Sequence, residues 1–280
     1  MHPITKNYRQ VDVFGGFSAA AGHSFYTARS YPKEYWNTIA FIAEPTGHLL
    51  HRAILESYGS GFIEKDGWNL LASSDEWTAP IQGTVGPDGN VWIIDWYNFI
   101  VQHNPTPKGF KNGKGNAHIN PLRDKTHGRI YRLIYLNNQE TQVTLDPKNS
   151  FSLLNGLKNS NLFWRLHAQR LIIENRYYTL IEDLLQLITT SVPDEININA
   201  PAVHAIWTLN GLNKMSNFKV LDVVYKALRN ENAGVRKAAL QALPNTKETL
   251  AQLIESGVFY DPNLNTRLAA FIKSVELPNS

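Results

Sequence analysis

Polar residues of the kinds that bind or transform small molecules cluster between residues 95 and 129 of the 280-residue chain, on both sides of a long stretch rich in Gly, Lys and Asn. Histidine exchanges protons near neutral pH, and arginine can clamp a carboxylate or an oxyanion. If the two ends of the stretch meet in the fold, these side chains would form one site. The candidate catalytic residues are Asp95, His103, His127 and Arg129, and the candidate substrate-binding residues are Asn98, Arg123 and Asp124.

A structural role for the same residues is the alternative. Arg123 and Asp124 would form an ion-pair network that pins the loop, and His127 would lie in a turn ahead of Gly128. So long an insertion in a β fold is usually either functional or disordered. The sequence contains no geometry that decides between a site and a scaffold.

An internal repeat places one of these candidates in a wider pattern. Asp95 aligns with Glu44, and Asn98 with Gly47, at an offset of 51 residues. Each copy is an apolar strand that ends in a carboxylate and is followed by a short corner. A carboxylate there can coordinate a metal ion or accept a hydrogen bond from a sugar hydroxyl, so Glu44 is a further candidate for substrate binding. Alternatively, each acid caps the backbone of its own corner.

Short apolar runs predict β-strands throughout the first half of the chain. The two runs at Asn37–Glu44 and His48–Leu55 predict a hairpin, and tight turns precede a strand at Asn90–Asp95. Further strands are predicted at Phe99–His103 and Gly128–Tyr135. Short strands that recur at roughly 40–50 residues are typical of β-propeller blades.

The segments 59–67 and 73–83 are rich in turn residues, so we expect loops there.

From about Phe151 the apolar residues recur at i, i+3, i+4 and i+7, which predicts helices. Four segments superpose around Arg165, His204, Arg236 and Arg267, and they suit helix pairs that stack on one another. These four positions would either line a concave binding surface or pair with neighbouring turns as part of the scaffold.

The helix starts ahead of the last two segments have candidate cap or turn residues, namely Asn230 or Asn232, and Asp261. Taken together, the two halves predict an α+β protein. Residues 1–149 would form two to three blade-like sheets of a partial β-propeller, and residues 150–280 a HEAT-like α-solenoid.

Composition excludes several classes of function. The 27 Lys and Arg and 24 Asp and Glu residues are interspersed and leave a net charge of only +3, which argues against a dedicated nucleic-acid binder. The absence of cysteine excludes disulfides, thiol nucleophiles and haem attachment through C-x-x-C-H. No apolar run reaches the ~18 residues of a membrane span, and the first residues lack the pattern of a signal peptide.

Three stretches carry recognisable motifs: AEPTGHLLHR at Ala43–Arg52, GPDGNVWIIDWYNFIVQHNP at Gly86–Pro105, and NPLRDKTHGRIYR at Asn120–Arg132. They resemble a group of dehydrogenase-like proteins of planctomycetes, verrucomicrobia and bacteroidetes. Members of that group join a sorbosone- or glucose-dehydrogenase-like propeller to HEAT repeats, and often to a cytochrome c domain. The resemblance is specific across Gly16–Tyr135 and generic in the helical half. Most of the propeller and the haem motif have no counterpart in this sequence.

The resemblance implies the C-terminal portion of a sugar- or alcohol-oxidising protein of the periplasm or cell envelope. The propeller would bind a carbohydrate substrate or a quinone cofactor, and the solenoid would dock an electron acceptor or another protein. A quinone or calcium would belong to the full-length protein, since no cofactor motif is evident in this chain.

Two further hypotheses stay open: a non-enzymatic module that binds carbohydrate or protein, and an inactive truncated fragment. Unclosed blades expose strand edges and apolar faces, so we expect the isolated chain to be poorly soluble or to need a partner.

Overall fold

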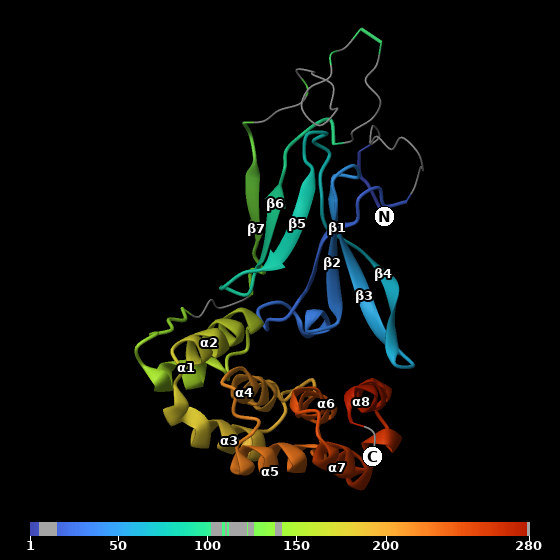
Figure 1. Cartoon of the computed structure of the whole chain (residues 1–280). Coiled ribbons are helices and arrows are strands. Elements are labelled where there is room, and N and C mark those ends of the chain that lie inside the picture. The colour runs from blue at the N-terminus through green and yellow to red at the C-terminus, as the bar shows by residue number, and fades with distance from the viewer. Residues whose placement is uncertain are drawn as a thin grey trace. The chain divides into compact units, whose positions relative to one another are not determined.

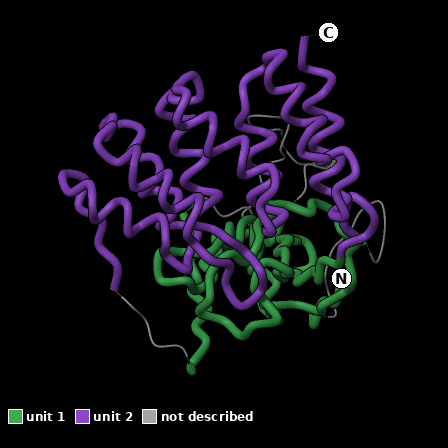
Figure 2. Tube along the Cα trace, turned by 90° about the horizontal axis from the view of Figure 1, so that it is seen from below, with its two compact units in different colours: residues 1–56, 63–141 green, residues 57–62, 142–280 purple. Residues whose placement is uncertain are grey.

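The computed structural model (Figure 1) describes residues 1–5, 16–101, 108–109, 111, 122, 126–137 and 142–278. These residues contain seven β-strands and eight α-helices, so the predicted α+β class is confirmed. The chain divides into two compact units, a β unit of residues 1–56 and 63–141 and a helical unit of residues 57–62 and 142–280 (Figure 2).

Two antiparallel sheets make up the β unit, one in the order β1-β2-β3-β4 and the other in the order β5-β6-β7. The strands span Ala21–Phe25 (β1), Ile39–Glu44 (β2), Leu49–Tyr58 (β3), Gly61–Ala72 (β4), Pro80–Val85 (β5), Val91–Asp95 (β6) and Arg129–Leu133 (β7). The predicted hairpin is confirmed as β2 and β3, which pair from Ile39 opposite Ile54 to Glu44 opposite Leu49.

The core of the β unit lies between the two sheets. Phe41 of β2 is buried together with Val91 and Ile93 of β6. The side chain of Leu50 lies directly on Gly83 of β5, where an added Cβ would come within 2.7 Å of it. One face of the first sheet is therefore packed on the second sheet, with the Leu50 side chain against the backbone of Gly83.

The strand predicted at Phe99–His103 is wrong for the residues that the structure describes, because residues 99–101 are not in a strand. The side chain of Asn98 accepts a hydrogen bond from the backbone N–H of Ile100 at 3.1 Å, and this local turn ends the extended path. The strand that pairs with β6 is instead β7, in a register that sets Asp95 opposite Arg129.

The loop expected at residues 59–67 is also wrong, because most of it belongs to β4, and the loop expected at 73–83 ends at Ala79, because β5 begins at Pro80. Strand β4 lies at the edge of the first sheet beside β3. Its glycines and alternating charges are typical of a loop, although the segment is a twelve-residue strand whose first six side chains are exposed.

The helical unit consists of α1 to α8, with a 3-10 turn before α3 and another before α8. The helices span Ser150–Gly156 (α1), Leu162–Glu174 (α2), Ile181–Thr190 (α3), Ala200–Gly211 (α4), Phe218–Ala227 (α5), Ala233–Ala242 (α6), Lys247–Ser256 (α7) and Leu264–Glu276 (α8). None of the described helices combines the length and the hydropathy that crossing a membrane requires.

The helices are arranged in two rows. Helices α2, α4, α6 and α8 contact one another in turn, and α3 and α5 pack against each other and against α4 and α6. Figure 2 shows these helix pairs side by side along the unit. One continuous core runs between the rows and includes Ile172, Leu184, Ile206 and Val224.

Candidate functional site

Glu44 closes the end of β2 and is fully buried. Its Oε2 accepts hydrogen bonds from the backbone N–H groups of Ser18 at 2.9 Å and Ala19 at 3.1 Å. Its Oε1 accepts from the Ser18 hydroxyl and from the backbone N–H of Thr46, two residues further along. One carboxylate oxygen therefore holds the segment that leads into β1, and the other holds the corner that follows β2.

Asp95 has the same role at the end of β6, where it is 1% exposed. Its Oδ1 accepts from the backbone N–H of Ala79 at 2.6 Å and from that of Tyr97 at 2.8 Å. Its Oδ2 accepts from the hydroxyl of Tyr131 at 2.8 Å. Each acid thus joins the N–H two residues downstream to the segment that leads into the preceding strand. This is the corner-capping arrangement that was the alternative to a substrate or metal site.

Arg129 extends the network of Asp95 to the surface. Its guanidinium lies 3.4 Å from the centroid of the Tyr97 ring, 3.4 Å from the Tyr131 hydroxyl and 3.6 Å from Asp75 Oδ2. The hydrogen bond to Tyr131 raises the pKa of Arg129 above its ordinary value. Burial raises the pKa of Tyr131, and the neighbouring Asp95 raises it further, so this phenol stays protonated and remains a donor to Asp95.

The other candidates of the sequence lie on the surface, in a buried turn or outside the described residues. His127 is exposed, and its Nδ1 lies 3.1 Å from the Thr126 hydroxyl. Asn98 is buried and caps its own turn. His103, Arg123 and Asp124 lie outside the residues that the structure describes. The structure therefore brings Asp95 and Arg129 together through Tyr131, whereas Glu44 serves a different corner.

The cluster around Arg129 can bind an anion or a hydroxyl group, because its guanidinium is about half exposed and stacked on Tyr97.

The fit to calcium can be judged from the donor set. The oxygens of Glu44 and Asp95 accept hydrogen bonds from the protein, and no three described His, Asp or Glu residues are arranged to hold a metal ion. The carboxylates of Glu44 and Asp95 therefore do not fit a calcium site.

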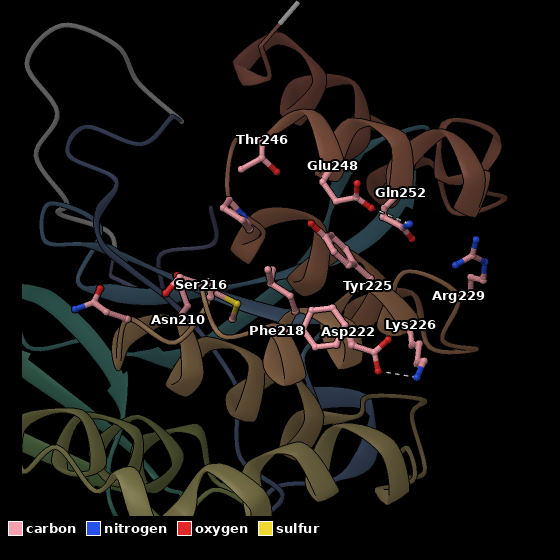
Figure 3. Close-up of a pocket in the computed structure, with 14 residues that line it drawn as sticks. Asn210, Ser216, Phe218, Asp222, Tyr225, Lys226, Arg229, Thr246, Glu248 and Gln252 are labelled. Atoms are coloured by element: carbon pink, nitrogen blue, oxygen red, sulfur yellow. Dashed lines mark hydrogen bonds and ion pairs between the residues drawn. The ribbon is translucent and has the colours of Figure 1, made fainter. Parts of the chain in front are cut away.

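The helical unit has a pocket of about 840 Å³ between α5 and α7 (Figure 3). Phe218, Leu221 and Tyr225 of α5 form its apolar side, and Glu248 and Gln252 of α7 lie across from them. Our sequence analysis missed this pocket. Phe218, Leu221 and Tyr225 follow helical spacing beside the buried stripe of α5, which includes Val220 and Val224, and this second apolar stripe was the available signal.

The repeated arginines of the helical unit support turns, as in the scaffold alternative. Each donates to a carbonyl six residues before it: Arg165 to Asn159, Arg236 to Asn230 and Arg267 to Asp261. Each also lies four residues after the asparagine that caps its helix, whereas His204 lies five residues after Asn199. His204 therefore does not share the arginine position, and its Nδ1 lies 2.7 Å from Gln169 Oε1.

Residues 1–137 match the model of one protein family, which is described only as a domain of unknown function (DUF7133). No curated protein and no solved structure matches the chain. The β unit is thus similar to a family whose description names no activity.

Proposed function

We propose that the chain is the C-terminal portion of a dehydrogenase-like envelope protein, and that it contributes binding surfaces rather than catalytic residues. In this proposal the β unit supplies sheets of a β-propeller and the helical unit is a HEAT-like α-solenoid. The hydrogen bonding of the Glu44 and Asp95 carboxylates is the observation that supports a role without catalytic residues. All four of their carboxylate oxygens accept hydrogen bonds from the protein itself.

The propeller hypothesis is supported by a comparison of one face of β2 with the face of β6 that aligns with it in the internal repeat. Phe41 and Ala43 are fully buried. At the offset of 51 residues their equivalents are Trp92 and Ile94 on β6, and Ile94 is 45% exposed beside Ile130, which is 68% exposed. The second sheet therefore presents a face that a further sheet of the same kind would cover, as in successive blades.

The solenoid hypothesis is supported by the regular rows of helices and by the repeated turn chemistry. Helices α2, α4, α6 and α8 follow one another in contact, and arginine supports the same turn before three of them. Structural repeats that contact only their neighbours build surfaces for partner proteins. Docking of an electron acceptor or another protein is accordingly assigned to this unit.

Size-exclusion chromatography with light scattering tests the proposal, using the whole chain and its Ile94→Lys variant. We expect the wild-type chain to self-associate or aggregate through the uncovered sheet face, and the variant to elute as a monomer with an unchanged unfolding midpoint. A wild-type chain that is monomeric at every concentration would count against an uncovered blade face.

The second candidate is an oxidoreductase site in which Arg129 and His127 contact a sugar or alcohol. It is favoured by the half-exposed guanidinium that is coupled to Asp95 through Tyr131. Oxidation of a hydroxyl group requires an acceptor for two electrons, so the assay follows aldose-dependent reduction of a dye with added quinone and Ca²⁺. Turnover that is lost in both His127→Ala and Arg129→Ala would replace the non-catalytic proposal with this one.

A further inference from the structure

The outer row of helices is interrupted between α5 and α7. Helix α3 packs against α5, whereas the backbones of α5 and α7 make few contacts and the two helices are joined by the hydroxyls of Tyr225 and Thr249 at 3.2 Å. The pocket of about 840 Å³ occupies the space between them. Its size is within the range of about 300–1,000 Å³ that is typical of ligand sites. The apolar side chains that would otherwise meet a neighbouring helix therefore line an opening to solvent.

Apolar side chains form the floor of this pocket. Phe218 is 86% exposed, although it occupies the first position of α5 after the cap residue Asn217. Leu221 and Tyr225 continue from it along α5, and Met215 and Pro244 complete the apolar lining. Figure 3 shows Phe218 and Tyr225 on the side of α5. An exposed phenylalanine beside further apolar lining marks a contact surface better than a single exposed side chain does.

Three of the four charged residues that line the rim, Asp222, Lys226 and Arg229, lie in ion pairs, whereas Glu248 accepts a hydrogen bond from a neutral amide. Lys226 Nζ lies 2.7 Å from Asp222 Oδ2 within α5, and Arg229 bonds Glu255 of α7 at 3.0 Å. Gln252 donates to Glu248 at 3.4 Å. A ligand with a large net charge would have to break these pairs, so the rim complements an uncharged ligand.

Side-chain amides complete the rim. Asn210 and Asn213 lie at the end of α4, and Gln252 lies on α7. A primary amide offers both donors and an acceptor, which is what a peptide backbone requires on each side. A fatty chain would use the apolar floor but would leave these amides without a ligand partner.

We propose that the α5–α7 pocket binds an uncharged segment of another protein, with one large aliphatic or aromatic side chain inserted beside Phe218 and Tyr225. This inference rests on the docking role proposed for the helical unit, and it names the site and the chemistry of the partner. Binding buries the exposed ring of Phe218, and the backbone of the segment pairs with Asn210, Asn213 and Gln252.

The test uses the whole chain and a phage-displayed library of short random peptides. We expect enriched peptides that carry a large apolar residue and no net charge, with affinities measured by fluorescence anisotropy. Phe218→Asp should weaken binding by about tenfold or more, because truncating a buried aromatic anchor commonly costs that much. Phe218→Leu should retain most of the affinity.

The matched control is Val192→Asp, which places the same charge at a residue that is 77% exposed and outside the pocket lining. It should leave binding unchanged. Asp at the first position of α5 is favourable for the helix N-terminus, so the Phe218 variant should fold, which far-UV circular dichroism verifies.

Three results would overturn the proposal. They are a library that yields no enrichment over bare support, peptides that bind the Phe218→Asp variant equally well, and strongly charged peptides. Self-association that is lost in Phe218→Asp would identify a second copy of the chain as the occupant instead. Self-association that is lost only in Ile94→Lys would be due to the exposed face of the second sheet. The test of the β unit is therefore independent of the test of the α5–α7 pocket.

Discussion

The hydroxyl of Tyr131 on β7 donates a hydrogen bond of 2.8 Å to Oδ2 of Asp95 on β6. This bond links two strands that are far apart in the sequence, because residues 96–128 separate them. It also occupies the carboxylate oxygen that is not used by the backbone of Ala79 and Tyr97. Asp95 therefore stabilises a corner and a strand pairing at once.

Removing this acid should destabilise the β unit. Asp95→Ala leaves two buried N–H groups and one hydroxyl without their acceptor, which should cost about 3 kcal/mol of the free energy of unfolding. Tyr131→Phe should cost about 1 kcal/mol, because only one hydrogen bond is lost. Urea unfolding followed by tryptophan fluorescence measures both values.

Tyr135→Phe is the control for the tyrosine substitution. It removes a hydroxyl that accepts one exposed hydrogen bond of 3.2 Å from Asn137, and it should change stability by less than about 0.5 kcal/mol. A stable Asp95→Ala variant that loses sugar oxidation would contradict the structural assignment of Asp95 and restore its catalytic one.

The ion pair between Arg236 and Asp261 should make the helical unit sensitive to acid. Arg236 Nε and Nη2 donate to the two carboxylate oxygens at 2.6 and 2.7 Å. Burial acts to raise the pKa of Asp261, but the hydrogen bonds from Arg236 and from the backbone of Asn263 outweigh it and hold the pKa below its ordinary value. A lowered pKa in the folded state contributes stability above the unfolded value of about 4, and this is lost as pH falls further.

Asp261→Asn should therefore cost about 3 kcal/mol at pH 7, and this difference from the wild type should shrink towards zero as the pH falls below about 4. Lys226→Gln, which breaks a surface pair, should cost less than about 0.5 kcal/mol. Urea unfolding followed by far-UV ellipticity at several pH values measures the effect. A pH-independent difference would refute the role of the carboxylate charge.

Burial of His204 should produce a second pH dependence in a separate window. Burial and, to a smaller extent, the nearby charge of Arg165 together lower the pKa of His204 to about 4. In the unfolded chain the His204 imidazole binds a proton near pH 6.5, whereas in the folded chain it stays neutral until about pH 4. The contribution of neutral His204 to the free energy of unfolding is therefore complete above pH 6.5 and is lost between about 6.5 and 4. The expected loss across this window is about 3 kcal/mol.

His204→Gln should flatten this part of the profile, because glutamine stays neutral and can still bond Gln169. The difference in unfolding free energy between this variant and the wild type at pH 7 measures any cost of packing glutamine in place of histidine. A variant whose stability falls as steeply between pH 6.5 and 4 as that of the wild type would show that His204 is not the group that titrates.

The sequence predicted elements whose signals are local. The hairpin of β2 and β3, the strand β6 and the change to helices at about Phe151 all follow from periodicity and turn residues within one segment. The repeat between Glu44 and Asp95 was also visible, since equivalent corners need equivalent acceptors. Asn232 caps α6 as predicted, and Asp261 holds the turn before α8.

The sequence did not predict the elements that depend on distant partners. The exposed start of β4 shows no alternation of apolar residues, so only its place beside β3 identifies it as a strand. The partner of β6 lies after the long insertion, which local reasoning cannot bridge. Tyr131 and Ala79 donate hydrogen bonds to the Asp95 carboxylate. They are brought next to it by the sheet register, which the sequence did not predict.

Two glycines of the first sheet and its hairpins share a positive φ but differ in their surroundings, so they should respond differently to alanine. Gly22 in β1 has φ of +57°, and an added Cβ would lie 2.3 Å from the carbonyl oxygen of Ile81 and 2.6 Å from Cα of Gln82. Gly59, at the hairpin between β3 and β4, has φ of +59° with nothing within 4 Å. Gly59→Ala should cost about 1 kcal/mol from the left-handed backbone alone. Gly22→Ala must also push β1 away from the backbone of β5, and should cost about 3 kcal/mol or more. Urea unfolding measures both, and equal costs at the two sites would contradict the close approach of β1 and β5 at Gly22.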